Sequence, residues 1–259
     1  MMRGMKPSPE ALRKPRKTAA KSAEPKASPL YVQVKALMLR RLVDGVWRAG
    51  APLPSEFQLA AEFGVSQGTV RKALDELAAE NTLVRRQGRG TYVAEHDEAR
   101  ALFHFFHLVG PDGQRRLPDS RVISARAAAA GAEEASRLAI ARGDRVLRIH
   151  RVRLLDGRPS IHETVVVPLA SFPGLEDIRP LPNTLYDLYQ RRWGVTIARA
   201  AERLGAVAAN AADAEQLGIA TGAPLLEIDR IALSLEGKPV EWRVSRCLTT
   251  THLYQVELG

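Results

Sequence analysis

The chain has 259 residues, 45% of them apolar, and a formal net charge of +9, which are the length and composition of a soluble protein of about two domains. Its one cysteine, Cys247, excludes an intramolecular disulfide and a cysteine-rich metal cluster. No run of about 18 to 20 apolar residues could cross a membrane, and the first 29 residues lack the apolar stretch of a secretion signal. We therefore expect a cytoplasmic protein.

The positive charge lies in the N-terminal third. Residues 1–29 hold eight basic and two acidic residues, residues 30–93 hold nine and six, and the remainder holds 21 of each. A contact with a polyanion is therefore expected near the N-terminus. Residues 1–29 show no apolar period that could offset the entropy of ordering, so we expect a disordered basic tail there. It would be either a solvated leader or an arm that touches DNA without sequence preference.

Three helices are predicted next. The first begins near Pro29 and stops before Gly45, and its apolar residues recur at helical spacing: Leu30, Val34, Leu37, Met38 and Leu42. Ser55 is a predicted N-cap for a short second helix that ends at Gly64. Ser66 caps a third helix, of which one face is apolar: Val70, Ala73, Leu74, Leu77 and Ala78. Two short helices separated by Gly64-Val65 are typical of a helix-turn-helix.

The exposed face of the third helix is basic at its start and acidic further along. Gln67, Thr69, Arg71 and Lys72 come first, and Asp75, Glu76 and Glu80 follow. The helix dipole favours the opposite order, so helix stability does not explain this arrangement, whereas a phosphate partner does. The alternative is an ordinary amphipathic helix with a solvated face.

A basic hairpin is predicted over residues 83–93. Two β-prone arms flank the tip Gln87-Gly88-Arg89-Gly90, where glycine supplies the positive φ of the turn. Arg85, Arg86 and Arg89 would let this ribbon lie along a nucleic-acid groove. A nucleotide-binding phosphate loop is disfavoured, because a third glycine and a following helix are both lacking.

Residues 30–93 resemble the winged helix-turn-helix of GntR-family bacterial transcription regulators. The resemblance is carried by Pro54-Ser55-Glu56, Leu59-Ala60, Phe63-Gly64-Val65-Ser66, Thr69-Val70-Arg71-Lys72-Ala73-Leu74, Leu77 and Arg85-Arg86-Gln87-Gly88-Arg89-Gly90-Thr91. It implies DNA contacts from Gln58, Ser66, Gln67, Thr69, Arg71, Gln87, Gly88 and Arg89, and the charge pattern adds Lys72. This sequence has Gln58 and Gln67 where the family often has arginine, and Gly68 where it usually has threonine. Glutamine suits adenine rather than guanine, so we expect an operator that differs at those steps.

The remaining chain is predicted to be a linker, residues 95–102, and a second domain, residues 103–259, after a tail at 1–29 and a DNA-binding domain at 30–94. Its predicted strands are 103–109, 121–127, 146–155, 160–167, 197–207, 225–235 and two that end at Leu248 and Leu258; its predicted helices are 133–141, 184–192 and 211–218. The turns Asp156-Gly157 and Glu236-Gly237 join neighbouring strands. Hairpins of this kind indicate a mainly antiparallel sheet and an α+β class.

Three arginines interrupt the apolar strand at 146–155. Alternation places Arg151 and Arg153 on one face and Arg148 on the other. Two arginines on one face need counter-charges, and Glu163 and Glu241 are the candidates. Either an internal ladder of ion pairs or a site for an anionic ligand would satisfy this pattern.

Residues 98–257 resemble the UTRA effector-binding domain of the HutC subfamily, through the Arg148–Arg153 strand, Asp156-Gly157-Arg158-Pro159, Glu163, Phe172-Pro173-Gly174-Leu175, Leu185-Tyr186, Pro224-Leu225-Leu226 with Arg230, and Gly237-Lys238-Pro239-Val240-Glu241. The resemblance implies a chorismate-lyase-like antiparallel sheet with flanking helices. It also implies effector contacts from Arg151, Arg153, Thr184 and Tyr186 to a phosphate or carboxylate, from Glu163 and Glu241 to hydroxyls or amides, and from Ser120.

Together these features predict a metabolite-responsive transcription regulator, a repressor that binds an inverted-repeat operator in double-stranded DNA as a homodimer and responds to a small anionic effector. No metal is expected, because the six histidines show no metal-ligand spacing. No cofactor or membrane contact is expected either. One alternative is an enzyme of chorismate-lyase-like fold fused to a DNA-binding module, although no Ser/His/Asp pattern supports it. Another is a nucleoid-type DNA binder without an effector.

Overall fold

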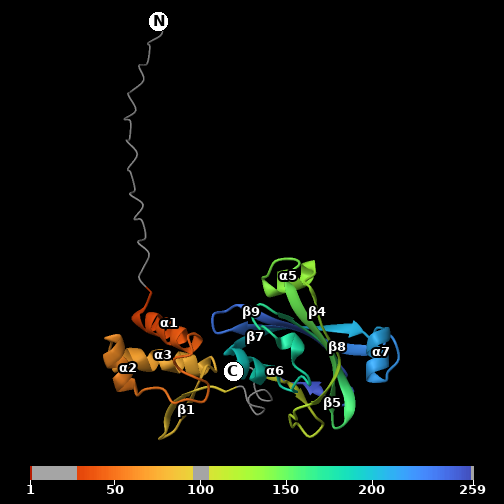
Figure 1. Ribbon diagram of the computed structural model, residues 1–259, viewed down its shortest axis with the longest axis horizontal. Helices are drawn as coiled ribbons and strands as arrows, with labels where there is room; N and C mark the ends of the chain where they lie inside the picture. The colour runs from red at the N-terminus through yellow and green to blue at the C-terminus, as the bar shows by residue number, and fades with distance from the viewer. Residues whose placement is uncertain (2–27, 96–104, 258–259) are drawn as a thin grey trace.

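The computed structural model describes residues 1, 28–95 and 105–257. Most of the predicted basic tail and most of the predicted linker lie outside these residues. The N-terminal helices and hairpin form one domain, a large sheet with its helices forms the other, and helix α6 lies on the side of the sheet that faces the N-terminal domain (Figure 1).

The N-terminal domain contains α1 (Leu30–Val43), α2 (Glu56–Phe63), α3 (Gln67–Ala79), β1 (Leu83–Arg86) and β2 (Gly90–Val93). Ser55 caps α2, and Gly64 ends it in the left-handed conformation with φ 65°. The Ser66 side chain accepts a hydrogen bond from the Thr69 N–H at the start of α3. These caps lie where the sequence predicts them, and the hairpin follows with Gly88 at φ 68°.

The core of this domain is narrower along α1 than predicted. Val34, Met38 and Leu42 are buried against α3, but Leu30 and Leu37 are 51% and 48% exposed. The buried positions are four residues apart and so follow one line along the helix. Because α1 packs on α3 along that line, the flanking leucines remain in solvent.

A six-stranded antiparallel sheet, in the order β4-β5-β6-β9-β8-β7, forms the second domain. Its strands are β4 (Asp119–Ala129), β5 (Arg145–Leu155), β6 (Arg158–Pro168), β7 (Ile197–Ala208), β8 (Pro224–Ser234) and β9 (Pro239–Cys247). The α+β class and the antiparallel sheet are as predicted. Of the predicted strand at 103–109, residues 103 and 104 lie outside the described residues, and in the rest β3 covers only Leu108–Val109, which pairs with β10 (Leu253–Tyr254). β3 and β10 therefore form a separate sheet of two strands, each two residues long.

Helices cover both faces of the sheet. Helix α6 (Leu185–Trp193) and the 3₁₀ turn η1 (Leu175–Asp177) pack on the face that carries Ile149 and Val165, with Phe172 and Tyr189 stacked at 4.3 Å. Helices α5 (Ala132–Leu138) and α7 (Ala211–Leu217) pack on the opposite face, one beside Val146 and the other beside Leu225. The result is a three-layer domain.

The sheet has an internal two-fold repeat that the sequence analysis missed. The unit β4-α5-β5-β6 recurs as β7-α7-β8-β9, and the two units meet where β6 pairs with β9. Equivalent positions carry identical residues at several points: Leu138 and Leu217, Ile140 and Ile219, Gly143 and Gly222, Leu147 and Leu226, Ile149 and Ile228, and Arg151 and Arg230. Arg151 and Arg230 therefore occupy corresponding places in the two halves.

Among the described residues, the two domains contact each other through α6 and through the turn between β8 and β9. The Gln190 side chain of α6 donates to the Ala94 carbonyl, directly after β2, at 3.1 Å. Leu235, in the turn between β8 and β9, packs against the hydrophobic core of the N-terminal domain. The contacts thus involve a helix and a hairpin of the sheet domain.

Candidate functional site

The start of α3 presents the polar side chains that the sequence analysis assigns to DNA. Gln67, Arg71 and Lys72 are exposed, and the Lys72 ammonium lies 3.9 Å from the centroid of the Tyr31 ring. The Ser66 hydroxyl lies 2.9 Å from the Thr69 hydroxyl. Ser66 and Thr69 therefore shape the first turn of the helix, and the three longer side chains extend from it.

Gln58 has a defined structural role in addition to its predicted contact. Its carboxamide oxygen accepts from the Ser55 N–H at 2.9 Å, and the Ser55 hydroxyl accepts from the Gln58 N–H. This reciprocal pair is a capping box that starts α2. The Gln58 side chain is thus held at the surface by the cap.

The wing presents Gln87, Gly88 and Arg89 at its exposed tip, as predicted for DNA contacts. The Arg86 guanidinium lies over the Tyr92 ring at 4.4 Å, and the Tyr92 hydroxyl donates to the Arg89 carbonyl at 3.1 Å. These contacts stiffen the hairpin. A cleft of about 550 Å³ separates its inner side from the start of α2.

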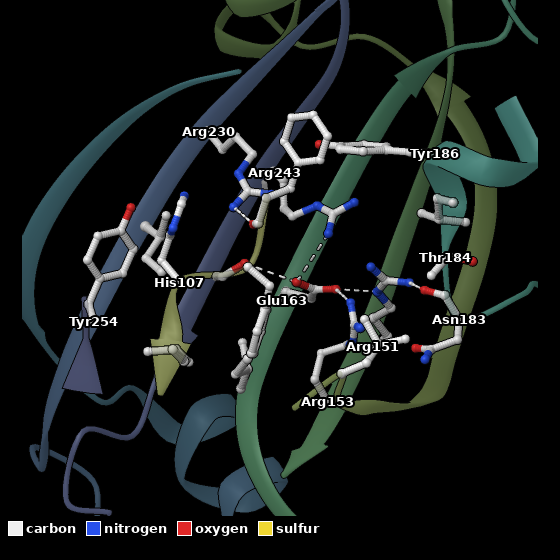
Figure 2. A pocket seen from close by; sticks show the side chains of 18 residues that line it. His107, Arg151, Arg153, Glu163, Asn183, Thr184, Tyr186, Arg230, Arg243 and Tyr254 are labelled. Atoms are coloured by element: carbon white, nitrogen blue, oxygen red, sulfur yellow. Dashed lines mark hydrogen bonds and ion pairs between the residues drawn. The ribbon is translucent and has the colours of Figure 1, made fainter. Parts of the chain in front are cut away.

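The second candidate site is a small cavity of about 70 Å³ on the α6 face of the sheet (Figure 2). Arg151, Arg153, Glu163, Thr184 and Tyr186, all predicted effector contacts, line it. The register explains part of this arrangement, because Arg151, Glu163 and Ser245 are direct cross-strand neighbours on β5, β6 and β9. The start of α6 closes one side, with Thr184 at its N-cap.

A buried ion-pair cluster forms the floor of the cavity. The Arg151 Nε donates to Glu163, the Arg153 Nη1 lies 3.4 Å from the same carboxylate, and the Ser245 hydroxyl donates to it at 3.0 Å. Burial alone would raise the pKa of Glu163, but the charges of Arg151, Arg243 and Arg153 outweigh it and lower that pKa well below its usual range. Burial and the neighbouring Arg151 also lower the pKa of Arg153, to about 9. Glu163 is therefore a permanent carboxylate surrounded by more than one arginine.

This cluster leaves hydrogen-bonding capacity unused. Among the buried side-chain atoms of the described residues that lack a hydrogen-bond partner, four lie in or beside this cluster: Arg151 Nη2, Arg153 Nε, Asn183 Oδ1 and Ser120 Oγ. Buried donors without partners are costly and mark places where a ligand or water binds. The internal ion-pair ladder therefore exists, and it retains guanidinium donors that are not used by the described residues.

Ser120 and Glu241 lie outside the lining of the cavity. Ser120 is the cross-strand neighbour of Arg153 on β4. Glu241 is fully buried, and its oxygens accept from Tyr186 at 3.1 Å, Tyr189 at 3.0 Å and Arg243 at 2.9 and 3.0 Å. Glu241 is therefore the counter-charge of Arg243, not of Arg151 and Arg153, and it ties α6 to the sheet.

The sequence analysis missed several lining residues, namely His107, Asn183, Arg230, Arg243, Ser245 and Tyr254. The internal repeat could have revealed Arg230, which is the counterpart of Arg151. Arg230 nevertheless has different partners from Arg151. It donates to the Glu202 carboxylate and to the Phe105 carbonyl. Phe105 also packs edge-on against Tyr186, with ring centroids 5.0 Å apart.

No cluster of histidine, cysteine or carboxylate side chains suited to a metal ion occurs within residues 28–95 and 105–257. Helices of the described segments are all too short or too polar to cross a membrane.

Comparison with known proteins decides the family. Residues 30–93 match the bacterial regulatory proteins of the gntR family, and residues 113–252 match the UTRA domain. The chain belongs to the GntR family. These matches confirm the predicted resemblance to the GntR family and the UTRA domain, together with the α+β fold class. They also confirm the predicted function of a DNA-binding transcription regulator with an effector domain.

Named relatives of this GntR-family regulator include transcriptional repressors. The repressor NagR of Bacillus subtilis is 31% identical over 214 residues, which are 82% of this chain and 88% of NagR. The histidine utilization repressor of Pseudomonas putida is 37% identical over 133 residues, 51% of this chain and 54% of that protein. The crystal structure of PhnF from Mycobacterium smegmatis is similar with a TM-score of 0.52 and 26% identity, covering 87% of this chain and 99% of PhnF.

Proposed function

We propose that this GntR-family regulator is a repressor that binds an inverted-repeat operator as a homodimer in the cytoplasm, and that a small anionic metabolite in the Arg151–Arg153 cavity alters its affinity for DNA. The observation that carries the effector is the pair of buried guanidinium nitrogens, Arg151 Nη2 and Arg153 Nε, that have no partner among the described residues. Buried arginine donors bind carboxylate or phosphate oxygens strongly.

The charge balance around the cavity supports an anion. Arg151, Arg153 and Arg243 surround the single carboxylate of Glu163, and Arg243 also pairs with Glu241. The excess positive charge lies on the β5 side, where the two unpartnered nitrogens are. An anionic group there would complete the cluster, and the aromatic rings of Phe105, Tyr186 and Tyr254 would contact the body of the ligand.

The same electrostatics favour a binding site over the alternative of a fused enzyme. A general acid or base works best with a pKa near the working pH. The arginines hold the pKa of Glu163 far below neutrality, and burial with the nearby Glu241 raises the pKa of Tyr186 to about 12. Neither group exchanges a proton readily at neutral pH.

Helix α6 offers a route from the cavity to the DNA-binding domain. Tyr186, in its first turn, lines the cavity, and Gln190, one turn later, donates to the Ala94 carbonyl and to Thr196. A ligand that shifts the start of α6 would shift Gln190 as well, because the two residues belong to one rigid helix. Such a shift would move the wing relative to the sheet.

The size of one DNA-binding unit supports a homodimer. A single recognition helix reads a short half-site, and two copies spaced by about 34 Å read an inverted repeat. The effector would then act by changing the spacing of the two helices, with a coupling of about 1 to 3 kcal/mol.

Operator binding with and without an effector tests the proposal. The full chain selects duplexes from a random library of about 25 base pairs. The melting temperature of the protein is then measured against a panel of carboxylate and phosphate metabolites. We expect an enriched inverted repeat and a stabilising anion that changes the affinity for it about 5- to 150-fold. Failure to enrich any sequence would refute DNA recognition, and an enriched operator whose affinity no anion changes would refute effector control.

A further inference from the structure

Glu56, the first residue of α2, lies at the junction of the three elements that form the DNA-binding face. Its Oε2 accepts from Arg71 of α3, at 2.9 Å from Nε and 2.8 Å from Nη2. Its Oε1 accepts from Nη1 of Arg85 in β1 at 3.2 Å. One carboxylate therefore joins the helix before the turn, the recognition helix and the base of the wing.

The contact fixes a side chain that would otherwise be free to move. The Arg71 side chain is 61% exposed, and an exposed arginine normally samples many rotamers. Here two of its three guanidinium nitrogens bind Glu56, so the plane and direction of the group are set before DNA arrives. Glu56 keeps its charge, because the hydrogen bond from Arg71 outweighs burial and lowers the pKa of the carboxyl group.

The second arm of the junction fixes the wing. Arg85 binds Glu56 with Nη1, Asp75 of α3 with Nη2 at 2.5 Å, and the Arg71 carbonyl at 3.5 Å. Arg85 is thus engaged by protein groups on both sides. It sets the angle between the hairpin and α3 and leaves the exposed wing tip to DNA.

We infer that Glu56 is a positioning residue for sequence-specific DNA recognition, one that orients Arg71 toward the groove and holds the wing through Arg85. The inference rests on the proposed DNA-binding function and adds a residue that carries the wrong charge for a phosphate contact. A negative charge beside DNA repels phosphates, so a role by charge alone and a role by positioning predict opposite effects when that charge is removed.

The experiment compares two substitutions and one control in the full chain. Glu56→Gln removes the charge at equal length, and Glu56→Ala removes both acceptors; neither alters the Ser55 and Gln58 side chains that cap α2. Glu62→Gln is the matched control, since Glu62 lies on the same helix and pairs with Arg41 at 2.6 Å. Affinities are measured by fluorescence anisotropy on the duplex that the wild-type protein selects and on a scrambled duplex of the same composition.

We expect Glu56→Ala to bind the selected duplex about 5- to 20-fold more weakly and the scrambled duplex equally or more tightly, so that the specificity ratio falls. Glu56→Gln, which keeps an acceptor for Arg71, should recover part of this loss. Glu62→Gln should leave the ratio unchanged. In an Arg71→Ala background, Glu56→Gln should have little further effect on the selected duplex.

Tighter binding of Glu56→Ala to both duplexes, to the same extent as Glu62→Gln, would overturn the inference in favour of simple charge. Equal loss in the Arg71→Ala background would also overturn it, because Glu56 would then act independently of Arg71. If Glu56→Ala melts too low to be assayed, Glu56→Gln and the double substitution still decide the question. A wild-type protein that selects no duplex would instead contradict the proposed function itself.

Discussion

Arg151→Ala should separate effector binding from DNA binding. Arg151 supplies one of the two buried guanidinium nitrogens left for a ligand, and hydrogen bonds to charged groups contribute about 1.5–3 kcal/mol each. Removing it should weaken binding of the stabilising anion about 10- to 150-fold. Operator binding without effector should change by less than about two-fold, since the substitution lies in the sheet domain.

The fold should survive this change. Glu163 keeps Arg153 at 3.4 Å, Ser245 at 3.0 Å and Arg243 at 3.9 Å, so its buried charge is not left without partners. We expect a loss of at most about 2 kcal/mol in the free energy of unfolding, or about 4–8 °C in Tm.

Two controls make the test sharp. Arg148→Ala removes an arginine from the same strand but from the opposite face, where it pairs with Glu134, and should leave effector binding intact. Arg71→Ala should show the reverse pattern, with operator binding weakened at least about 10-fold and effector binding unchanged. Effector affinity is measured by calorimetric titration of the anion, and operator affinity by fluorescence anisotropy on the selected duplex. Matching losses for Arg151→Ala and Arg148→Ala, or joint loss of both activities in Arg151→Ala, would refute the reasoning.

Four further outcomes are expected. Gln190→Ala should leave each affinity within about two-fold but reduce the effector's influence on operator binding, measured by anisotropy with saturating anion; unchanged coupling would rule out the α6 route. Glu241→Gln removes the carboxylate that Arg243 binds through two nitrogens, with Glu163 left at 3.9 Å, and should lower the free energy of unfolding by about 3 kcal/mol, seen as a Tm drop of about 6–12 °C by calorimetry; a smaller drop than for Arg151→Ala would contradict its role. The lowered pKa of Glu163 gives stability that is present above about pH 4.3 and lost as the pH falls, so Tm should decline in acid and Glu163→Gln should flatten that decline. Gly68→Ala should raise the free energy of unfolding by up to about 1 kcal/mol, because alanine favours the helix more than glycine and its Cβ would meet only Ser66 Oγ at 3.8 Å. A lower Tm would show that the start of α3 needs glycine.

Local signals predict the DNA-binding domain well. Ser55, Gly64 and Ser66 are caps whose effect lies within one helical turn, and the structure places helix boundaries beside each of them. The burial of α1 is less predictable, because Leu30 and Leu37 fit the helical period yet lack a neighbour on their side. Periodicity shows which face could be buried, and the packing partner decides how wide that face is.

The candidate effector site is predictable only along single strands. Alternation on β5 places Arg151 and Arg153 together, and the adjacent hairpin strand brings Glu163 to them. Alternation on β9 likewise places Glu241 and Arg243 on one face, but the delivery of Tyr186 and Tyr189 to the same carboxylate by α6 could not be foreseen. Likewise His107 and Tyr254 reach the cavity through β3 and β10, two-residue strands with almost no sequence signal.

Arg151 and Arg230 lie at equivalent positions of the duplicated sheet, but they make different contacts. Arg151 keeps a nitrogen available, whereas Arg230 is fastened to Glu202 and to the Phe105 carbonyl, close to where the chain arrives from the DNA-binding domain. Of these two corresponding arginines, one thus keeps a donor at the cavity and the other holds a carboxylate and a backbone carbonyl. The two halves of the repeat therefore line the cavity with arginines of unequal hydrogen-bonding capacity, although the strands that carry them correspond.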